Sequence, residues 1–431
     1  MTTATVRLWG TTIGYVSMAV GERFARFEYD PDFAAAGIEL APLHMPVVAR
    51  RVYQFRELDV RTFHGLPGLL ADSLPDKYGN RLIDVWLART GRSPEQFQAV
   101  DRLCYTGTRG MGALEFEPST GLGDEQDQPL EVAQLVELAA LAFAEKSQLD
   151  TVLSGERGDA ALLDILRVGT SAGGARAKAV IAFDPKTKQV RSGQMSLPPG
   201  FEHWLIKFDG VLRSGDWGIA DPQGYGLLEY AYSRLAGQCG VTMAECRLLQ
   251  ENGRSHFMTR RFDRDANGGK RFVQTFGALA HFDYNATGQY SYEQLFQTMR
   301  QLRVPPAAME QQFRRVVFNV VGCNQDDHVK NFAFVMDRQG QWDLAPAYDL
   351  CHAEGSAFTS RHQLSIGGKT GGFTRADLKA LADHAGLPRG RDRRVLDEVV
   401  AAFRGLLPLA ESLGVPAGLV AHVRSTLRLD W

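Results

Sequence analysis

Hydrophobic and polar positions alternate along the first part of the chain. In residues 1–30 the stretches "VRLWGTTIGYVSM" and "RFARFEYD" alternate, with glycine-containing turns, which predicts a hairpin or a small sheet. The polar, acidic stretch 119–129 is the best linker candidate in the first half of the chain. Before it, the spacing of an amphipathic helix is carried by Leu82, Val85, Trp86 and Arg89. The first part is therefore expected to be a β-rich module with a helix.

The middle of the chain mixes strand and helix patterns. A glycine-rich stretch, "VGTSAGGARAK" (168–178), leads into an apolar strand over residues 179–183, and "HWLIKF" (203–208) predicts a second short strand. "GLLEYAYSRLAGQCG" has the spacing of a helix that ends at a glycine. The next apolar runs flank Asn252-Gly253, a dipeptide typical of hairpin turns. These patterns predict a mixed lobe of strands and helices.

From about residue 275 the pattern is mainly helical. Ser291 and Gln294 form a capping box at the start of one helix, and "AAMEQQFRRVVFNVVG" predicts a buried helix that stops at Gly322. A polar loop, residues 324–331, separates this helix from the strand-like "FAFVMD". Upstream, His281 is expected to be structural or to line a substrate groove. The order of patterns predicts a β-rich module, a mixed lobe and a helical lobe.

Composition limits the classes of function. The chain has 431 residues, 44% of them hydrophobic, and a formal net charge of −2, so it is long enough for two or three domains and shows no basic footprint for nucleic acid or membrane. Its five cysteines form no C-x-x-C pair, which favours reduced thiols over disulfides or a zinc site. The first residues lack a secretory-signal pattern and no apolar run could span a bilayer. We therefore expect a cytoplasmic protein without direct nucleic-acid or membrane contact.

The loop "NQDDHVKNFAF" carries the densest chemistry. Asp326 and Asn331 have the spacing D-x-x-x-x-N, at which a kinase catalytic loop presents a carboxylate to the substrate hydroxyl and an amide oxygen to magnesium. Taken alone, this spacing is also typical of a solvated loop with an Asx-turn. His328 and Lys330 are expected to hold the turn of the loop, His328 by hydrogen bonding and Lys330 through its charge. The role of Asp327 stays open: it is a bystander, a metal ligand or a substrate contact.

A second carboxylate follows in the order that kinases use. After the predicted strand, "WDLAPAYDL" is interpreted as a second short strand with Asp349 at its end, where a kinase hairpin presents another metal-binding carboxylate. The alternative is an ordinary aspartate that caps a turn. Asp343 is a nearby competitor, but its position at the start of the strand is more typical of a turn residue.

Lys207 lies inside the apolar stretch "HWLIKF", although a lysine is seldom buried without a partner. It is either a lysine at a sheet edge that reaches solvent, or a phosphate-binding lysine paired with Glu229 on the following helix. The upstream glycine-rich loop offers backbone N–H groups to phosphate, although it is neither a Walker A loop nor the kinase G-x-G-x-x-G pattern. The predicted ATP-binding set is Lys207, Glu229, Ser171, Gly173, Gly174, Lys178, His328 and Lys330.

Six stretches in this order resemble the HipA family, serine/threonine kinase toxins of bacterial type II toxin–antitoxin systems. They are "LPGLLADSLPDKYGNRL", "GMGALEF", "HWLIKFDG", "HFMTRRFDR", "NQDDHVKNFAF" and "LAPAYDL". A further stretch, "QTFGALAHFDYNATGQYSYEQ", resembles the YjjJ-like branch. The resemblance implies an α+β, two-lobed protein-kinase-like fold with an extra N-terminal β-rich subdomain and a helical C-terminal lobe. On this basis the domains are placed at residues 1–125, 126–260 and 261–431.

The resemblance also implies roles for single residues. Asp326 would be the catalytic aspartate, and Lys207 would contact the phosphates of ATP. Asn331 and Asp349 would bind Mg²⁺. Ser171, or the threonine before it, falls where the family autophosphorylates its glycine-rich loop.

The function implied by the resemblance is an ATP- and Mg²⁺-dependent serine/threonine protein kinase that inhibits growth by phosphorylating a cellular protein. The best-known relatives act on an aminoacyl-tRNA synthetase, and the usual partner is a helix-turn-helix antitoxin of the HipB type. Two alternatives stay open. One is a catalytically weak kinase-fold co-repressor that acts with a DNA-binding antitoxin, and the other is a small-molecule kinase.

Overall fold

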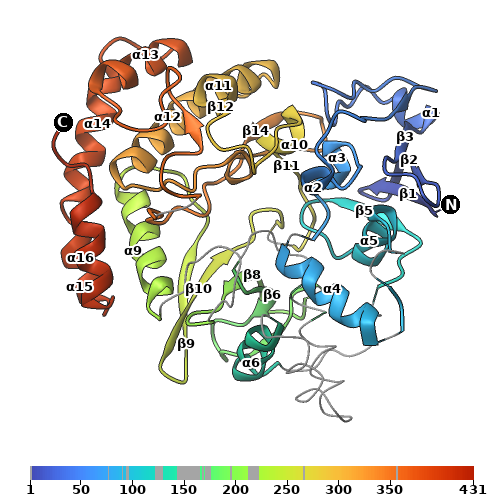
Figure 1. The fold of residues 1–431 in the computed structure, drawn as a ribbon, viewed down its shortest axis with the longest axis horizontal. Coiled ribbons are helices and arrows are strands. Elements are labelled where there is room, and N and C mark those ends of the chain that lie inside the picture. Colours follow the sequence, from blue (N-terminus) through green and yellow to red (C-terminus); the bar gives the residue numbers. More distant parts are fainter. Residues whose placement is uncertain are drawn as a thin grey trace.

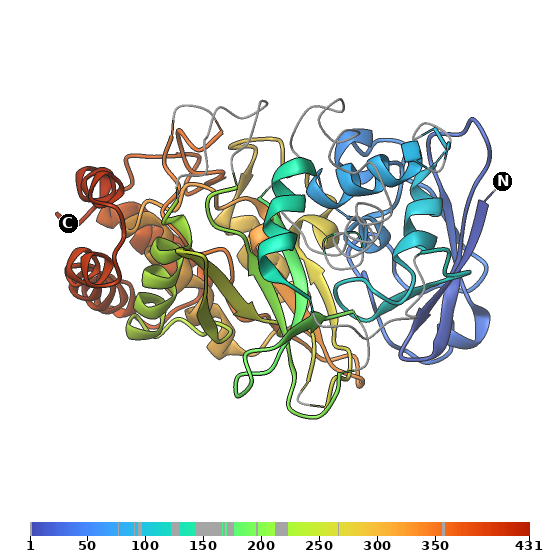
Figure 2. The same cartoon turned by 90° about the horizontal axis from the view of Figure 1, so that it is seen from below.

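A computed structural model gives the fold of the chain. Figure 1 shows an N-terminal sheet, a second sheet with its helices, and a mainly helical C-terminal part. The two termini lie at opposite ends of the long axis (Figures 1 and 2). The structure describes residues 2–75, 77–89, 91–93, 97–121, 130–142, 166, 169, 176–194, 197–211, 223–265, 267–355 and 358–431.

The N-terminal sheet has five antiparallel strands in the order β4-β3-β2-β1-β5. They are β1 (Thr2–Leu8), β2 (Thr11–Met18), β3 (Arg26–Tyr29), β4 (Val52–Tyr53) and β5 (Leu114–Glu117). Along β1, Ala4, Val6 and Leu8 are buried and the residues between them are not. One face therefore packs on a core, and the predicted small sheet is confirmed. The helices here are α1 (Pro31–Ala34), α2 (Val60–Phe63), α3 (Gly68–Ala71), α4 (Lys77–Arg89) and α5 (Ala99–Thr106).

The second sheet is also antiparallel, in the order β7-β6-β8-β10-β9, so β8 is its central strand. Its strands are β6 (Lys178–Phe183), β7 (Val190–Ser192), β8 (Glu202–Lys207), β9 (Cys246–Glu251) and β10 (Arg254–Arg260). Helix α9 (Tyr225–Gln238) packs on β9 and β10, whereas α4 and α6 (Val132–Ala142) share a separate apolar core with β6 and β8. Asn252 and Gly253 join β9 to β10 with positive φ angles of 43° and 75°, which confirms the predicted hairpin turn.

The C-terminal part combines two small sheets with packed helices. Strands β11 (Phe272–Thr275), β13 (Ala333–Met336) and β14 (Trp342–Leu344) form one sheet, and β12 (Tyr290–Ser291) pairs in parallel with β15 (Leu364–Ser365). The helical elements are α10 (Phe276–Ala280), α11 (Tyr292–Gln301), α12 (Pro306–Val321), the 3₁₀ turn η2 (Val329–Asn331), α13 (Arg375–Ala385), α14 (Arg391–Phe403), α15 (Leu406–Ser412) and α16 (Ala417–Thr426). Among the described residues, no helix combines the length and apolarity needed to cross a membrane.

Single residues account for the start of α11 and the end of α12. The capping box at α11 forms as predicted, because the Ser291 N–H donates to Gln294 Oε1 at 2.8 Å and the Gln294 N–H donates to Ser291 Oγ at 3.2 Å. Helix α12 stops at Gly322, where a Cβ would lie 2.5 Å from the Phe403 ring. A glycine at this position therefore lets α14 approach the end of α12.

The N-terminal module docks on the C-terminal part through α3 and α10. His281, which caps the end of α10, accepts a hydrogen bond from the Gly68 N–H at 3.2 Å through Nε2. Its ring stacks on His44 at 4.3 Å. Desolvation, with a smaller contribution from His44, lowers the pKa of His281 to about 3. His281 therefore has the structural role that was one of its two interpretations.

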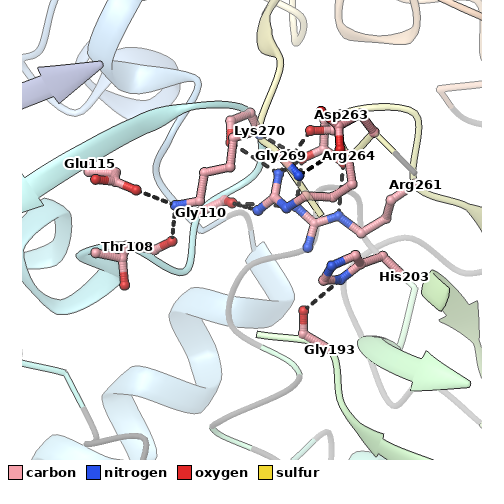
Figure 3. A network of polar contacts seen from close by, with 12 residues as sticks. Thr108, Gly110, Glu115, Gly193, His203, Arg261, Asp263, Arg264, Gly269 and Lys270 are labelled. Carbon is pink, nitrogen blue, oxygen red and sulfur yellow. Dashed lines mark hydrogen bonds and ion pairs between the residues drawn. The ribbon is translucent and has the colours of Figure 1, made fainter. Parts of the chain in front are cut away.

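A buried ionic network holds the connection between the second and third sheets (Figure 3). The Asp263 carboxylate accepts hydrogen bonds from Arg261 at 2.8 and 2.6 Å, from Arg264 at 2.6 Å and from the Gly112 N–H at 2.8 Å. Arg264 also donates to the carbonyl of Gly112 at 3.1 Å. Because Gly112 belongs to the N-terminal module, this network fastens that module to the segment between β10 and β11.

Candidate active site

Two lysines lie side by side under α9. Lys178 on β6 and Lys207 on β8 are direct cross-strand partners, so both side chains are on the same face of the sheet. Lys207 is only 8% exposed and its Nζ lies 2.5 Å from Glu229 Oε1 on α9. It also pairs with Asp349. The predicted Lys207–Glu229 pair is therefore present, and the interpretation of Lys207 as an edge lysine is wrong because β8 is the central strand.

The charges of this cluster are strongly coupled. Desolvation would lower the pKa of Lys207, but the attraction of Asp349 and Glu229 outweighs it and raises the pKa above its usual range. Desolvation likewise opposes ionisation of Asp349, and the nearby Lys207 and Lys178 hold its pKa well below the usual range. Arg176 adds a third cation 3.5 Å from Glu229 Oε2. Among the described residues, Lys178, Lys207 and Arg176 are the cations of this cluster that can attract an entering phosphate electrostatically.

The predicted catalytic loop follows α12 and exposes Asp326. The side chain of Asp326 keeps 45% of its surface exposed, so a substrate hydroxyl can reach it. Desolvation by the surrounding protein raises its pKa, His328 opposes this shift, and the negative charge of Asp349 adds to it. The Asn331 side chain donates from Nδ2 to the Asp326 carbonyl oxygen at 2.6 Å. This hydrogen bond holds the two ends of the predicted D-x-x-x-x-N motif together.

His328 and Lys330 organise the turn of the loop. His328 Nδ1 accepts from the Lys330 N–H at 3.2 Å and caps η2, which confirms its expected role as a loop organiser. The Lys330 ammonium lies 5.2 Å from the centre of the Tyr284 ring, and the Lys330 carbonyl accepts from the Tyr348 hydroxyl at 2.5 Å. Their contact with ATP stays a prediction.

The position of Asp349 corrects one expectation. Strands β13 and β14 form the predicted hairpin, but β14 ends at Leu344, so Asp349 is five residues beyond the strand and not at its end. Pro346 has no N–H to extend the sheet. Asp349 adopts a left-handed φ of 53°, an unusual conformation for a residue other than glycine. Asp343 is exposed on β14, which leaves Asp349 as the carboxylate that reaches the lysines.

The predicted magnesium ligands have suitable chemistry. Asn331 uses its amide nitrogen within the loop, which leaves the carbonyl oxygen Oδ1 as a donor to a metal. The Asp349 side chain is 32% exposed. One carboxylate and one amide oxygen, completed by water and phosphate oxygens, match the usual coordination of Mg²⁺. Binding of the ion by these two residues stays a prediction.

Of the glycine-rich stretch 168–178, the structure describes Gly169 and the C-terminal residues 176–178. Arg176 stacks on the Tyr225 ring at 4.3 Å, and Lys178 begins β6. The remaining predicted phosphate-loop and phosphorylation positions lie outside the described residues: Thr170, Ser171, Gly173 and Gly174.

The sequence did not identify the hydrogen-bond partners of Asp327. Asp327 is buried and accepts hydrogen bonds from Tyr292 and His362, and Asn319 donates to the Tyr292 hydroxyl. No local pattern in the sequence indicates this polar contact of Tyr292. Asn319 could have been noticed, because a polar residue in the middle of "VVFNVV" needs a buried partner.

The fold and the site together define a class. The chain is an α+β protein with a two-lobed kinase-like arrangement, in which a strand lysine, a helix glutamate and two loop aspartates are near one another. Two family models match the sequence: the HipA N-terminal domain over residues 4–117 and the HipA-like C-terminal domain over residues 170–406. The chain therefore belongs to the HipA family.

Known proteins resemble the chain to different extents. It is 27% identical over 323 residues to a protein of Sinorhizobium fredii (strain NBRC 101917 / NGR234) provisionally named kinase Y4mE, covering 70% of this chain and 66% of that protein. It is 30% identical over 160 residues to a protein of Haemophilus influenzae provisionally named a kinase, covering 33% of this chain and 47% of that protein. The chain thus spans less than two thirds of the length of either relative.

Among solved structures, the chain resembles one from the Shewanella oneidensis MR-1 toxin–antitoxin complex of HipA, HipB and operator DNA. The TM-score is 0.68, over 98% of this chain and 95% of that chain, at 18% sequence identity. At this identity the likeness shows a shared fold. The predicted fold class is confirmed: α+β and two-lobed, with an N-terminal β-rich part and a helical C-terminal part.

Proposed function

We propose that this HipA-family chain is a kinase that uses Mg²⁺ and ATP to phosphorylate a serine or threonine of a cellular protein, and that it acts as the toxin of a type II toxin–antitoxin system. The observation that carries the proposal is the simultaneous pairing of Lys207 with Glu229 and Asp349. A buried lysine held in this way has the charge and position to bind a nucleotide phosphate.

Each side chain then has a defined task. Glu229 holds Lys207 in place, and Lys207 with Lys178 receives phosphate oxygens. Asp326 orients the substrate hydroxyl and accepts its proton, a task favoured by its raised pKa. Asn331 and Asp349 would hold the metal, which when bound shields the charge of the transferred phosphoryl group.

The partner proposed for this chain is a HipB-type antitoxin. Support comes from the shared fold with the Shewanella protein, whose structure contains HipB and operator DNA. In such a pair, the antitoxin contacts the DNA. The protein substrate is proposed only by class, with an aminoacyl-tRNA synthetase as one member to test.

The deciding experiment incubates the purified chain with γ-labelled ATP, Mg²⁺ and host lysate. The wild type should label a lysate protein, and Asp326→Ala should abolish that label. Asp343→Asn is the matched control, because this exposed aspartate is on the hairpin between the two site aspartates and should leave labelling unchanged.

The other outcomes separate the alternatives. Nucleotide binding without transfer would reject the kinase in favour of a co-repressor, and label found only in small metabolites would indicate a small-molecule kinase. Label on the chain itself should disappear in Ser171→Ala if that serine is the phosphoacceptor, and its persistence would direct attention to Thr170. Induced expression should arrest growth in the wild type and not in Asp326→Ala.

A further inference from the structure

Asp327, the neighbour of the proposed catalytic residue, is fully enclosed. Its side chain has 0% exposed surface. The carboxylate accepts hydrogen bonds from the Tyr292 hydroxyl at 2.5 Å, His362 Nδ1 at 2.8 Å and the Gln363 N–H at 2.7 Å. Both carboxylate oxygens have donors, so binding a metal or a substrate would require it to give up these partners. Of the three interpretations left open by the sequence, none describes this arrangement.

Two of the three donors belong to residues 358–366, which we name the anchored segment. This segment follows Asp349 in the chain and returns to the catalytic loop. Gln363 donates from Nε2 to the carbonyl of Gln325 at 3.3 Å, and β15, inside the segment, pairs with β12. The anchored segment is therefore held against the loop next to Asp326.

The third donor, the Tyr292 hydroxyl, extends this hydrogen-bond network toward α12. Asn319 on α12 donates from Nδ2 to the Tyr292 hydroxyl at 3.2 Å. Asn324 donates from Nδ2 to Asn319 Oδ1 at 3.0 Å and to the Asp349 carbonyl at 3.4 Å. A continuous chain of hydrogen bonds thus runs from the anchored segment through Asp327 to the backbone of Asp349.

We propose that Asp327 is a positioning residue, which anchors residues 358–366 and fixes the catalytic loop relative to Asp349; this role rests on the proposed kinase function. The physical reason is the shared backbone of Asp326 and Asp327. Because Asp327 is held inward by three donors, the peptide before it cannot rotate freely, and the Asp326 carboxylate stays directed outward. The carbonyl contact from Asn324 fixes Asp349 in the same framework.

The test combines kinetics with hydrogen exchange. Asp327→Asn keeps the size of the side chain but places an amide nitrogen where one of the donors must bond. We expect kcat to fall about 100-fold, the order of loss that follows a small misplacement of reacting groups. The dissociation constant for ATP measured without Mg²⁺ should change little, because Lys207 and Glu229 are outside this hydrogen-bond chain, whereas the proposed metal ligand Asp349 is at its end. Amide exchange should accelerate in residues 358–366 and not throughout the protein.

Matched variants separate positioning from folding. His362→Gln keeps an N–H donor for Asp327 and should retain most of kcat, whereas His362→Leu removes the donor and should lower kcat. Tyr292→Phe removes one other donor and should give an intermediate loss. It also replaces Asp327→Asn if that variant does not fold. Asp326→Ala should abolish transfer while exchange in residues 358–366 stays as in the wild type.

The outcomes that would overturn the proposal are distinct from failure of the proposed function. Wild-type kcat in Asp327→Asn would exclude the positioning role. So would a lowered kcat with unchanged exchange in residues 358–366, or equal losses in His362→Gln and His362→Leu. A wild-type chain that never transfers phosphate would overturn the proposed function, and the catalytic meaning of Asp327 with it, even where the exchange result showed the anchoring.

Discussion

Replacing Asp263 by asparagine should loosen the joint between the N-terminal module and the two kinase-like lobes. Asp263 is 1% exposed and its carboxylate is the shared acceptor for Arg261, Arg264 and the Gly112 N–H. Burial alone would raise the pKa of Asp263, but Arg261 and Arg264 outweigh burial and hold it well below the usual range. The two arginines therefore favour the ionised form of this carboxylate.

The size of the effect follows from the two arginines that remain. Asp263→Asn keeps the volume but removes the negative charge, so two largely buried guanidinium groups lose their counter-charge. The asparagine nitrogen would also face donors, because all four hydrogen bonds to the carboxylate come from N–H groups. Removing one partner of a buried ion pair costs about 3–5 kcal/mol, which is a large fraction of the roughly 5–15 kcal/mol that stabilises a domain.

The assay is urea unfolding combined with amide exchange. Asp263→Asn should lower the unfolding midpoint and accelerate exchange in residues 108–115, which the network holds. Glu411→Gln is the control: its pair with Arg424 spans 3.2 Å between side chains that are both more than half exposed, and such a pair is worth less than about 1 kcal/mol. Equal losses of stability in the two variants would refute this reasoning, because the burial of Asp263 and the hydrogen bonds that it accepts would then have contributed nothing.

Three further predictions concern the pH dependence of stability, helix α9, which carries Glu229, and Lys207. The pKa of His281 is lowered to about 3, so the neutral form of this residue stabilises the fold fully above pH 6.5, and on the order of 2 kcal/mol of the free energy of unfolding should be lost by about pH 4.5. The urea midpoint should therefore fall less steeply with decreasing pH in His281→Gln than in the wild type, and parallel curves would contradict this. Gly226→Ala places a Cβ 2.3 Å from the Ser255 carbonyl oxygen, which should lower the free energy of unfolding by about 1–3 kcal/mol and weaken Mg-ATP binding in calorimetry. Gly237→Ala on the same helix places a Cβ that meets nothing within 4 Å, so it should change neither stability nor Mg-ATP binding. Lys207→Met should lower kcat about 100-fold by removing a phosphate contact, and a steady-state rate equal to the wild type would exclude that contact.

Local rules made much of the fold predictable. The alternation of β1, the Asn252-Gly253 turn and the capping box at Ser291 each depend on a few consecutive residues, and such preferences can be read directly from the sequence. The pairing of Lys207 with Glu229 could also be predicted, because a lysine in an apolar strand needs a partner and the next helix offers one. The domain boundaries at residues 125 and 260 stay predictions.

Contacts between distant segments were not predictable from local patterns. Asp349 was placed too close to a strand because strand length depends on which backbone groups find partners, and the sequence around Pro346 alone does not show where pairing stops. The donors to Asp327 are 35 and 36 residues away in the chain, so its buried state depends on tertiary packing that no spacing rule contains.

Two separate sets of contacts join parts of this fold that are distant in the sequence. The Asp263 network ties the segment between the second and third sheets to the N-terminal module. Elsewhere, Asp349 is bound by its carboxylate to Lys207 of the second sheet and by its carbonyl to Asn324 of the predicted catalytic loop. A phosphate that binds Lys207 competes with Asp349 for the same ammonium group. Since a carboxylate released from a lysine is free to bind a metal, we expect nucleotide and Mg²⁺ to enter this site cooperatively.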